Sequence, residues 1–140
     1  MEILAPGMAA LRTWMIISLV LYVVGGLSFL LGPNLMLENF NTLSQRLFKD
    51  RLPLIPLSTE RFWLALTISM MLMLVVICAF VAADPQKYYV MVVVLLFSKA
   101  ASTIQYIVLF SQRRFLAYAM GFISDGPLFI ITLYFFIRAV

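Results

Sequence analysis

The chain has 140 residues, of which 64% are hydrophobic and only 11% are charged. Soluble globular proteins are about half apolar and about a quarter charged, and a chain of this length has too much surface for its volume to bury so much apolar area in water. The composition therefore excludes an ordinary soluble domain and an intrinsically disordered chain. We expect lipid to be the solvent for most of the protein.

The chain contains no histidine and a single cysteine, Cys78. These counts exclude His-based zinc and haem sites and paired-cysteine metal or redox motifs. We accordingly predict that this chain binds neither a metal nor a cofactor by itself. Ten basic residues outnumber six acidic ones, but most of them lie in two short stretches between apolar runs. Membrane topology explains that placement better than nucleic-acid binding does.

Four apolar runs have about the 20 residues that a membrane-spanning helix needs. They cover residues 13–31, 62–83, 88–110 and 115–137. The runs are continuous and lack the alternation of barrel strands. The first run is longer than the apolar region of a signal peptide, and no small-residue cleavage site follows it. The sequence therefore predicts an all-α fold, a four-helix transmembrane bundle built as one integral membrane domain over residues 1–140.

Short turns connect the later runs. Residues 83–86 and 111–114 form these turns, so the helices that they join should be antiparallel neighbours. Aromatic residues lie at the ends of the runs, as in the belt that anchors membrane helices at the lipid–water boundary. These residues are Trp14, Trp63, Tyr88, Tyr89 and Phe115.

The long connection between the first two runs contains a further predicted helix over residues 35–48. Its apolar residues recur at positions i, i+4, i+7 and i+11, which places them on one helix face; they are Met36, Phe40, Leu43 and Leu47. We expect this amphipathic helix to lie in the membrane interface. The alternative is that a groove of a soluble partner binds the same face.

The basic residues on the two sides of the membrane differ in number. The side of the N-terminus carries Arg12, Lys87 and Arg138. The other side carries twice as many: Arg46, Lys49, Arg51, Arg61, Arg113 and Arg114. The positive-inside rule places the richer side, with the loops 32–61 and 111–114, in the cytoplasm, and it places both termini outside.

Two charged residues fall in the middle of apolar runs, Lys99 in the third and Asp125 in the fourth. Intramembrane charges are costly and usually face the interior of a helix bundle. Lys99 and Asp125 lie almost equally far along the chain from the turn between Gln112 and Arg113. In an antiparallel hairpin they would therefore differ in depth by only about 1.5 Å. The spacing predicts a buried Lys99–Asp125 ion pair.

Further polar residues should surround this pair near mid-membrane. On a helical wheel the polar residues of the third run gather on one side, and counting from the turn at residues 84–85 brings one residue of the second run level with Lys99. The predicted neighbours are Ser98, Ser102, Thr103, Gln105, Tyr106 and Ser69. Such a cluster can simply hold the helices together through interhelical hydrogen bonds. It can also form a lipid, quinone or other ligand site, or a path for protons or ions.

Catalysis by this cluster is not expected. Ser98 and Ser102 lie close to Lys99, and a serine–lysine dyad is chemically feasible. However, a neighbouring carboxylate keeps a lysine charged and makes it a poor general base. We therefore predict no catalytic residues.

The chain resembles the small four-helix DoxX-like membrane proteins of bacteria in topology. The resemblance rests on Gly25-Gly26-Leu27-Ser28 at the end of the first run, Phe62-Trp63 at the start of the second, and Ser98-Lys99-Ala100-Ala101-Ser102 in the third. It implies a bacterial inner-membrane location and a role beside a quinone-linked redox complex, in which a partner would hold the redox centre.

The predicted function is that of a non-catalytic accessory or scaffold subunit of a larger membrane complex. Its partners would be the lipid bilayer and either other membrane subunits or further copies of itself. A lipid- or quinone-binding protein with its pocket at Lys99 and Asp125 is the first alternative. A small oligomeric transporter is the second.

Overall fold

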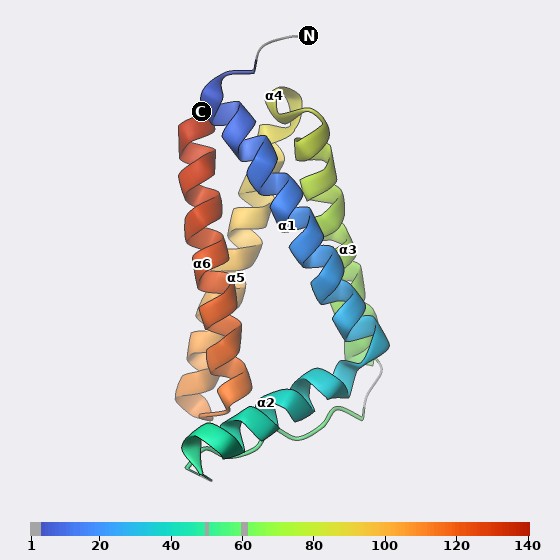
Figure 1. Cartoon of the computed structure of the whole chain (residues 1–140), viewed down its shortest axis with the longest axis vertical. Coiled ribbons are helices and arrows are strands. Elements are labelled where there is room, and N and C mark those ends of the chain that lie inside the picture. Colours follow the sequence, from blue (N-terminus) through green and yellow to red (C-terminus); the bar gives the residue numbers. More distant parts are fainter. Residues whose placement is uncertain (1–3, 50, 60–61) are drawn as a thin grey trace.

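A computed structural model describes residues 4–49, 51–59 and 62–140, and all regular structure in these residues is helical. The elements in chain order are α1 (Pro6–Leu31), α2 (Pro33–Phe48), α3 (Phe62–Ala83), α4 (Pro85–Tyr88), the 3-10 turn η1 (Tyr89–Met91), α5 (Val92–Gln112) and α6 (Leu116–Ala139). Figure 1 shows their arrangement. The predicted all-α class is confirmed.

Four helical segments in the described part of the chain are long and apolar enough to cross a membrane. They are α1, α3, the continuous stretch from α4 through α5, and α6. The first begins at Pro6 instead of residue 13, because proline at the first helical position lacks only an N–H that would be unpaired there anyway. These four segments match the four predicted apolar runs.

The long helices form two closely packed pairs, α1 with α3 and α5 with α6. The pairs meet where α1 crosses α6 near the two termini (Figure 1). Gly7 is pressed against the backbone of Arg138 at this crossing, so no larger residue would fit there without a shift. The two pairs then diverge toward the end of the molecule that carries α2 (Figure 1).

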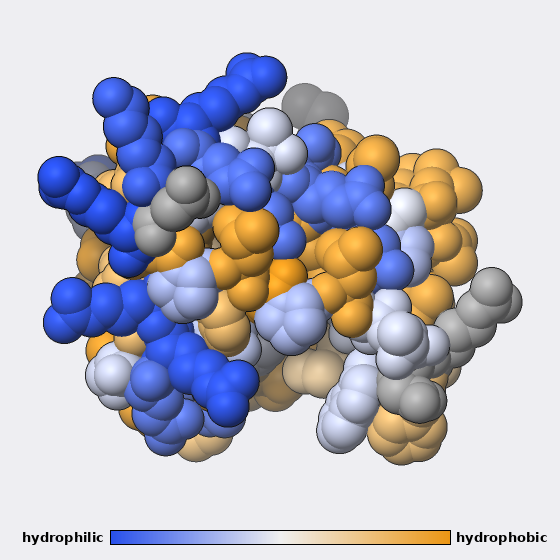
Figure 2. Space-filling model, turned by 90° about the horizontal axis from the view of Figure 1, so that it is seen from below, coloured by the Kyte–Doolittle hydropathy of each residue, from blue (hydrophilic) through white to orange (hydrophobic). Residues whose placement is uncertain are grey.

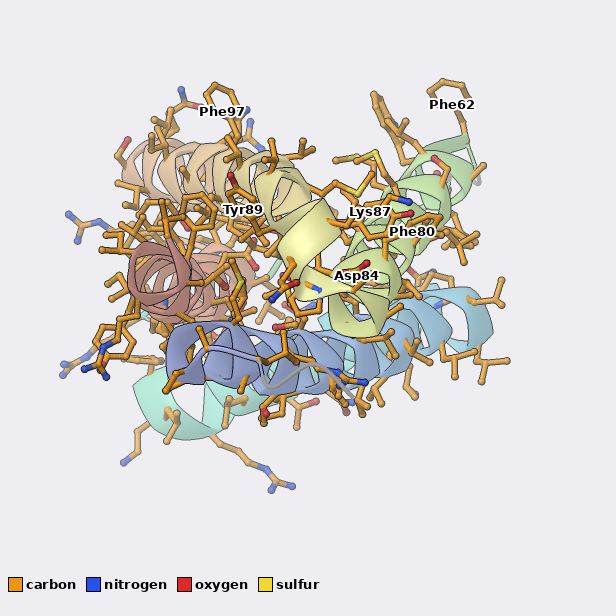
Figure 3. All side chains as sticks on the ribbon, turned by 90° about the horizontal axis from the view of Figure 1, so that it is seen from above. Phe62, Phe80, Asp84, Lys87, Tyr89 and Phe97 are labelled. Atoms are coloured by element: carbon orange, nitrogen blue, oxygen red, sulfur yellow. The ribbon has the colours of Figure 1, made fainter. Side chains whose placement is uncertain are left out.

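The short turn after α3 does not make α3 and α5 close neighbours, contrary to the prediction from its length. The two helices are antiparallel but share few contacts. The physical reason is the path of residues 85–91. There, α4 and η1 carry the chain across the end of the bundle before α5 begins (Figure 3). Asp84 stabilises the start of this crossing by accepting a hydrogen bond from the Lys87 backbone N–H at 3.1 Å.

The buried core lies in the half of the bundle that contains the termini, which we call the packed half. Its buried residues are Leu11, Met15, Ser18, Tyr22, Leu74, Ile77, Cys78, Val81, Val92, Leu95, Leu96, Lys99 and Thr132. Thr132 is the one buried residue that α6 contributes among those described. We call the other half, where the pairs diverge, the open half; it contains residues 25–31 of α1 and 62–71 of α3.

The predicted helix at residues 35–48 exists as α2, which crosses the open half at its end (Figure 1). Two asparagines hold the returning chain beside it. The Asn41 amide donates to the Ile55 carbonyl and accepts from the Ile55 N–H, both at 2.9 Å. Asn34 makes the same pair of hydrogen bonds with Ser58, both at 3.0 Å. Because the two asparagines lie seven residues apart, they share one helix face.

The predicted apolar face of α2 is only partly covered by the protein. Met36 and Phe40 are half-buried, whereas Leu43 and Leu47 are exposed. Ser44 is the buried residue of this helix. Apolar side chains thus remain available on α2 for contact with lipid or with another protein.

Candidate functional site

Lys99 and Asp125 form an ion pair between α5 and α6, as their spacing predicted. The Lys99 ammonium lies 2.8 Å from the Asp125 carboxylate, and the two side chains are only 6% and 14% exposed. It is the one ion pair that the described residues contain. The pair lies near the middle of the α5–α6 hairpin, and Lys99 is itself part of the buried core.

The second carboxylate oxygen of Asp125 is also occupied. Ser102, which lies nearly one turn after Lys99 on α5, donates its hydroxyl to this oxygen at 2.5 Å. Thr103 donates its hydroxyl to the Lys99 backbone carbonyl at 2.7 Å. Both carboxylate oxygens are therefore fixed by α5, and the α5–α6 hairpin is linked by one charged and one neutral donor.

Helix α1, which belongs to the other helix pair, also contacts the Lys99–Asp125 ion pair. The Lys99 ammonium lies 4.9 Å from the centre of the Tyr22 ring, a distance typical of a cation–π contact. Cys78 on α3 is fully buried and lies within electrostatic range of Lys99. The site is therefore built by three elements around α5, with Tyr22 and Cys78 joining the residues that the sequence predicted.

Two buried hydroxyls on α1 have no hydrogen-bond partner within the described part of the chain. These are the Tyr22 phenol and the Ser18 hydroxyl, which lie one helical turn apart. An unpaired buried polar group is costly, and most costly where lipid replaces water. The two hydroxyls are thus unsatisfied polar groups of the buried core, and one of them belongs to the ring that contacts Lys99.

Tyr106 belongs to the same hairpin but packs instead of hydrogen-bonding. A Cβ placed on Gly121 would lie 2.7 Å from the Tyr106 ring, so the ring rests directly on the α6 backbone. Gly126 faces Thr103 with ordinary spacing. Two glycines of α6 therefore let α5 approach closely on either side of Asp125.

Three predicted members of the polar cluster do not join it. Ser69 is exposed, and its hydroxyl donates to the Leu66 carbonyl within α3. Gln105 is exposed on α5, and Ser98 is half-buried and makes no side-chain hydrogen bond within the described part of the chain. Counting residues from the turn placed Ser69 at the same depth in the bundle as Lys99. Residues 85–91, however, run across the end of the bundle, so they advance the chain little along the bundle axis. The residues that α3 does bury lie further along the helix and include Cys78.

The arrangement offers binding groups more than reactive ones. Lys99 and Ser102 both donate to the Asp125 carboxylate, so the three side chains are engaged with one another. Within the described residues, no group of three or more Cys, Asp or Glu side chains could hold a metal ion. The chemistry that remains is hydrogen bonding and charge–dipole interaction with a polar group.

Comparisons with known proteins do not extend this description. No protein-family model matches the chain, and no curated protein or solved structure is significantly similar to it. The function must therefore be argued from the chain's own geometry.

Proposed function

We propose that this protein is a non-catalytic accessory or scaffold subunit that assembles with other membrane proteins through its open half. The observation that carries the proposal is the divergence of the two helix pairs (Figure 1). Most buried side chains gather where the pairs meet, whereas residues 25–31 of α1 and 62–71 of α3 contain no buried residue among those described. A partner helix that enters the open half would complete the bundle.

The glycines of α1 support this proposal. Gly26 contacts Met71 of α3, whereas a Cβ on Gly25 would meet nothing within 4 Å. Apolar exposure alone is ordinary in lipid, because lipid tails are as apolar as leucine side chains. A small residue in an uncovered position is more informative, because small residues let a neighbouring helix approach its backbone closely.

Replacing Gly25 with leucine tests the proposal. The side chain fits in the isolated subunit, so the fold should persist, but it would obstruct a partner helix. Val24→Leu on the neighbouring exposed position is the matched control. We expect affinity-tagged Gly25→Leu to lose the partners that the wild type and Val24→Leu retain in mild detergent. Equal recovery of partners by all three proteins would overturn the proposal.

We further propose that the protein lies in a bacterial inner membrane with both termini outside. The basic residues favour this orientation, although Arg61 lies outside the described residues. The exposed leucines of α2 would then lie in the cytoplasmic interface. Single cysteines at Ala139 and Ser111, in a Cys78→Ala background, test it. An impermeant maleimide should label residue 139 in intact cells and residue 111 only after lysis; the reverse pattern would contradict it.

A second candidate function is binding of a lipid or quinone headgroup at the ion pair. It is favoured by the unpaired hydroxyl of Tyr22, whose ring contacts Lys99, and by that of Ser18 one turn away on α1. The DoxX-like resemblance agrees with a quinone-linked partner. Organic extraction of the purified protein should then recover a quinone or lipid that Tyr22→Phe loses, while Tyr134→Phe, an exposed control, keeps it. Equal retention would exclude this candidate.

A small oligomeric transporter would use the same cluster differently. It would move a solute or proton into liposomes and fail when Lys99→Arg enlarges the buried cation. A pair that is already neutral as a unit favours binding over ion transport, so we place this function last.

A further inference from the structure

Five basic residues gather at one end of the molecule, where α2 ends and α5 turns into α6. Figure 2, which views the molecule from this end, shows hydrophilic residues gathered on one side of it. The five basic residues are Arg46, Lys49, Arg51, Arg113 and Arg114, all exposed. We call these residues the basic end. Within the described part of the chain, none of them has a carboxylate at ion-pair distance. Asp50 is the only acidic residue of the two segments in the sequence.

Two sharp changes of chain direction bring these residues together. Lys49 ends α2 in the left-handed conformation, with φ 44°, which residues other than glycine rarely adopt. The Arg51 N–H then donates to the Phe48 carbonyl at 3.0 Å. At the other segment, Arg113 ends α5 in an extended conformation, and α2 contacts the start of the following α6.

An apolar pocket of about 410 Å³ lies between the two segments. Its walls are Phe48 and Leu52 from the α2 side and Phe110 and Leu116 from the hairpin, and Arg114 also lines it. A second pocket of about 410 Å³ shares Phe48 and is lined by Lys49 and Arg51. One aromatic side chain thus separates an apolar recess from a basic one.

We infer that the basic end binds an anionic phospholipid. The headgroup phosphate would lie among Lys49, Arg51 and Arg114, and an acyl chain would occupy the recess formed by Phe48, Leu52, Phe110 and Leu116. Basic pockets at the ends of membrane helices bind anionic headgroups in this way. The positive-inside rule accounts for the number of cations, but it does not account for an apolar recess lined by Arg114 next to a pocket lined by Lys49 and Arg51, with Phe48 common to both.

The inference is tested with purified full-length protein in mild detergent. Phosphatidylglycerol and phosphatidylcholine with the same acyl chains are added, and the lipids retained are counted by native mass spectrometry. We expect the wild type to retain phosphatidylglycerol preferentially. Arg51→Gln with Arg114→Gln should weaken that retention about 30-fold, as expected for removal of two basic residues from an anionic surface. Lys87→Gln with Arg138→Gln removes the same charge from the opposite end and should leave retention unchanged.

A second variant tests the apolar recess without a change of charge. Ala119 lines the recess, so Ala119→Phe should fill it and reduce phosphatidylglycerol retention, whereas Ala101→Phe at an exposed position should not. Circular dichroism checks that all variants are folded. Equal retention of the two lipids by the wild type would overturn the inference. Equal losses of phosphatidylglycerol retention in the two double variants would also overturn it. The same holds if only an acidic polypeptide displaces the bound lipid.

Discussion

The packed half and the open half of the bundle are made of similarly apolar helices but differ in what they bury. In the packed half, α1 buries Leu11, Met15, Ser18 and Tyr22 against the other helices. In the open half, the same helix buries none of the described residues and places Gly25 against empty space. Hydrophobicity therefore does not decide where this chain packs.

Polar and small residues decide it instead. Lys99, Asp125 and Ser102 fix α5 to α6, and Trp14 on α1 donates to Thr132 on α6 at 2.9 Å. Lipid removes the hydrophobic drive between helices, so hydrogen bonds and close backbone contacts choose the partners. Among the described residues, no hydrogen bond or ion pair links the two helix pairs in the open half.

The largest expected effect comes from breaking the ion pair. Asp125→Asn strands the buried Lys99 charge, and we expect it to lower the free energy of unfolding by about 3–5 kcal/mol. Lys99→Met combined with Asp125→Leu removes both charges and should cost much less. Denaturation by SDS in mixed micelles measures both. Costs that simply add in the double variant would contradict the pairing, and Lys87→Met serves as an exposed control.

The two glycines Gly121 and Gly25 compare a tight contact inside the α5–α6 pair with an uncovered position on α1. Gly121→Ala forces a methyl group against the Tyr106 ring, so we expect a loss of about 1–3 kcal/mol in unfolding free energy. Gly25→Ala meets no neighbour and should stabilise α1 by up to about 1 kcal/mol. The same unfolding assay applies. Equal effects at the two sites would show that Gly25 is packed as tightly as Gly121.

Substitution of Asn41 tests how the return segment, residues 51–59, is held beside α2 at the end of the open half. Asn41→Ala removes two hydrogen bonds to Ile55, each worth about 1 kcal/mol. We expect faster hydrogen exchange and easier proteolysis over residues 51–59, with little change elsewhere. Asn39→Ala on the exposed side of α2 is the matched control. Unchanged exchange at residues 51–59 would mean that other contacts hold the return segment.

The smallest effect is expected at the link between the helix pairs. Thr132→Val leaves the Trp14 indole N–H without its acceptor, and interhelical hydrogen bonds in membranes contribute about 0.6–1.7 kcal/mol. Trp63→Phe is the control, because Trp63 is exposed in the open half. A thermal stability assay in detergent should rank Thr132→Val below both the wild type and Trp63→Phe. The opposite order would show that the Trp14–Thr132 hydrogen bond does not stabilise the fold.

The sequence predicted those features that depend on spacing along one chain segment. The four spans follow from run length, α2 from its periodicity, and the Lys99–Asp125 pair from nearly equal distances to one tight turn. The roles of Tyr22 and Cys78 were not predictable in this way. Cys78 lies on a helix that is apolar all round, so no periodicity indicates which of its faces turns inward. Ser18 and Tyr22 do mark the inward side of α1, but the contact of Tyr22 with Lys99 joins residues 77 positions apart.

Other features depended on contacts that local patterns do not contain. Trp14 fits an aromatic belt by position, yet its indole bonds to Thr132 on α6. Ser69 was misplaced because the path of α4 and η1 is invisible to a residue count. The bonds from Asn34 and Asn41 to the return segment join residues 24 and 14 positions apart, beyond the reach of helical periodicity.

The most direct test of the central claim is the mass of the intact particle extracted from native membranes in a mild detergent. The account predicts a particle well above the 15.9 kDa of this chain, with other membrane proteins present at fixed stoichiometry. A lone 15.9 kDa species, or an assembly of this chain alone, would contradict a role as an accessory subunit.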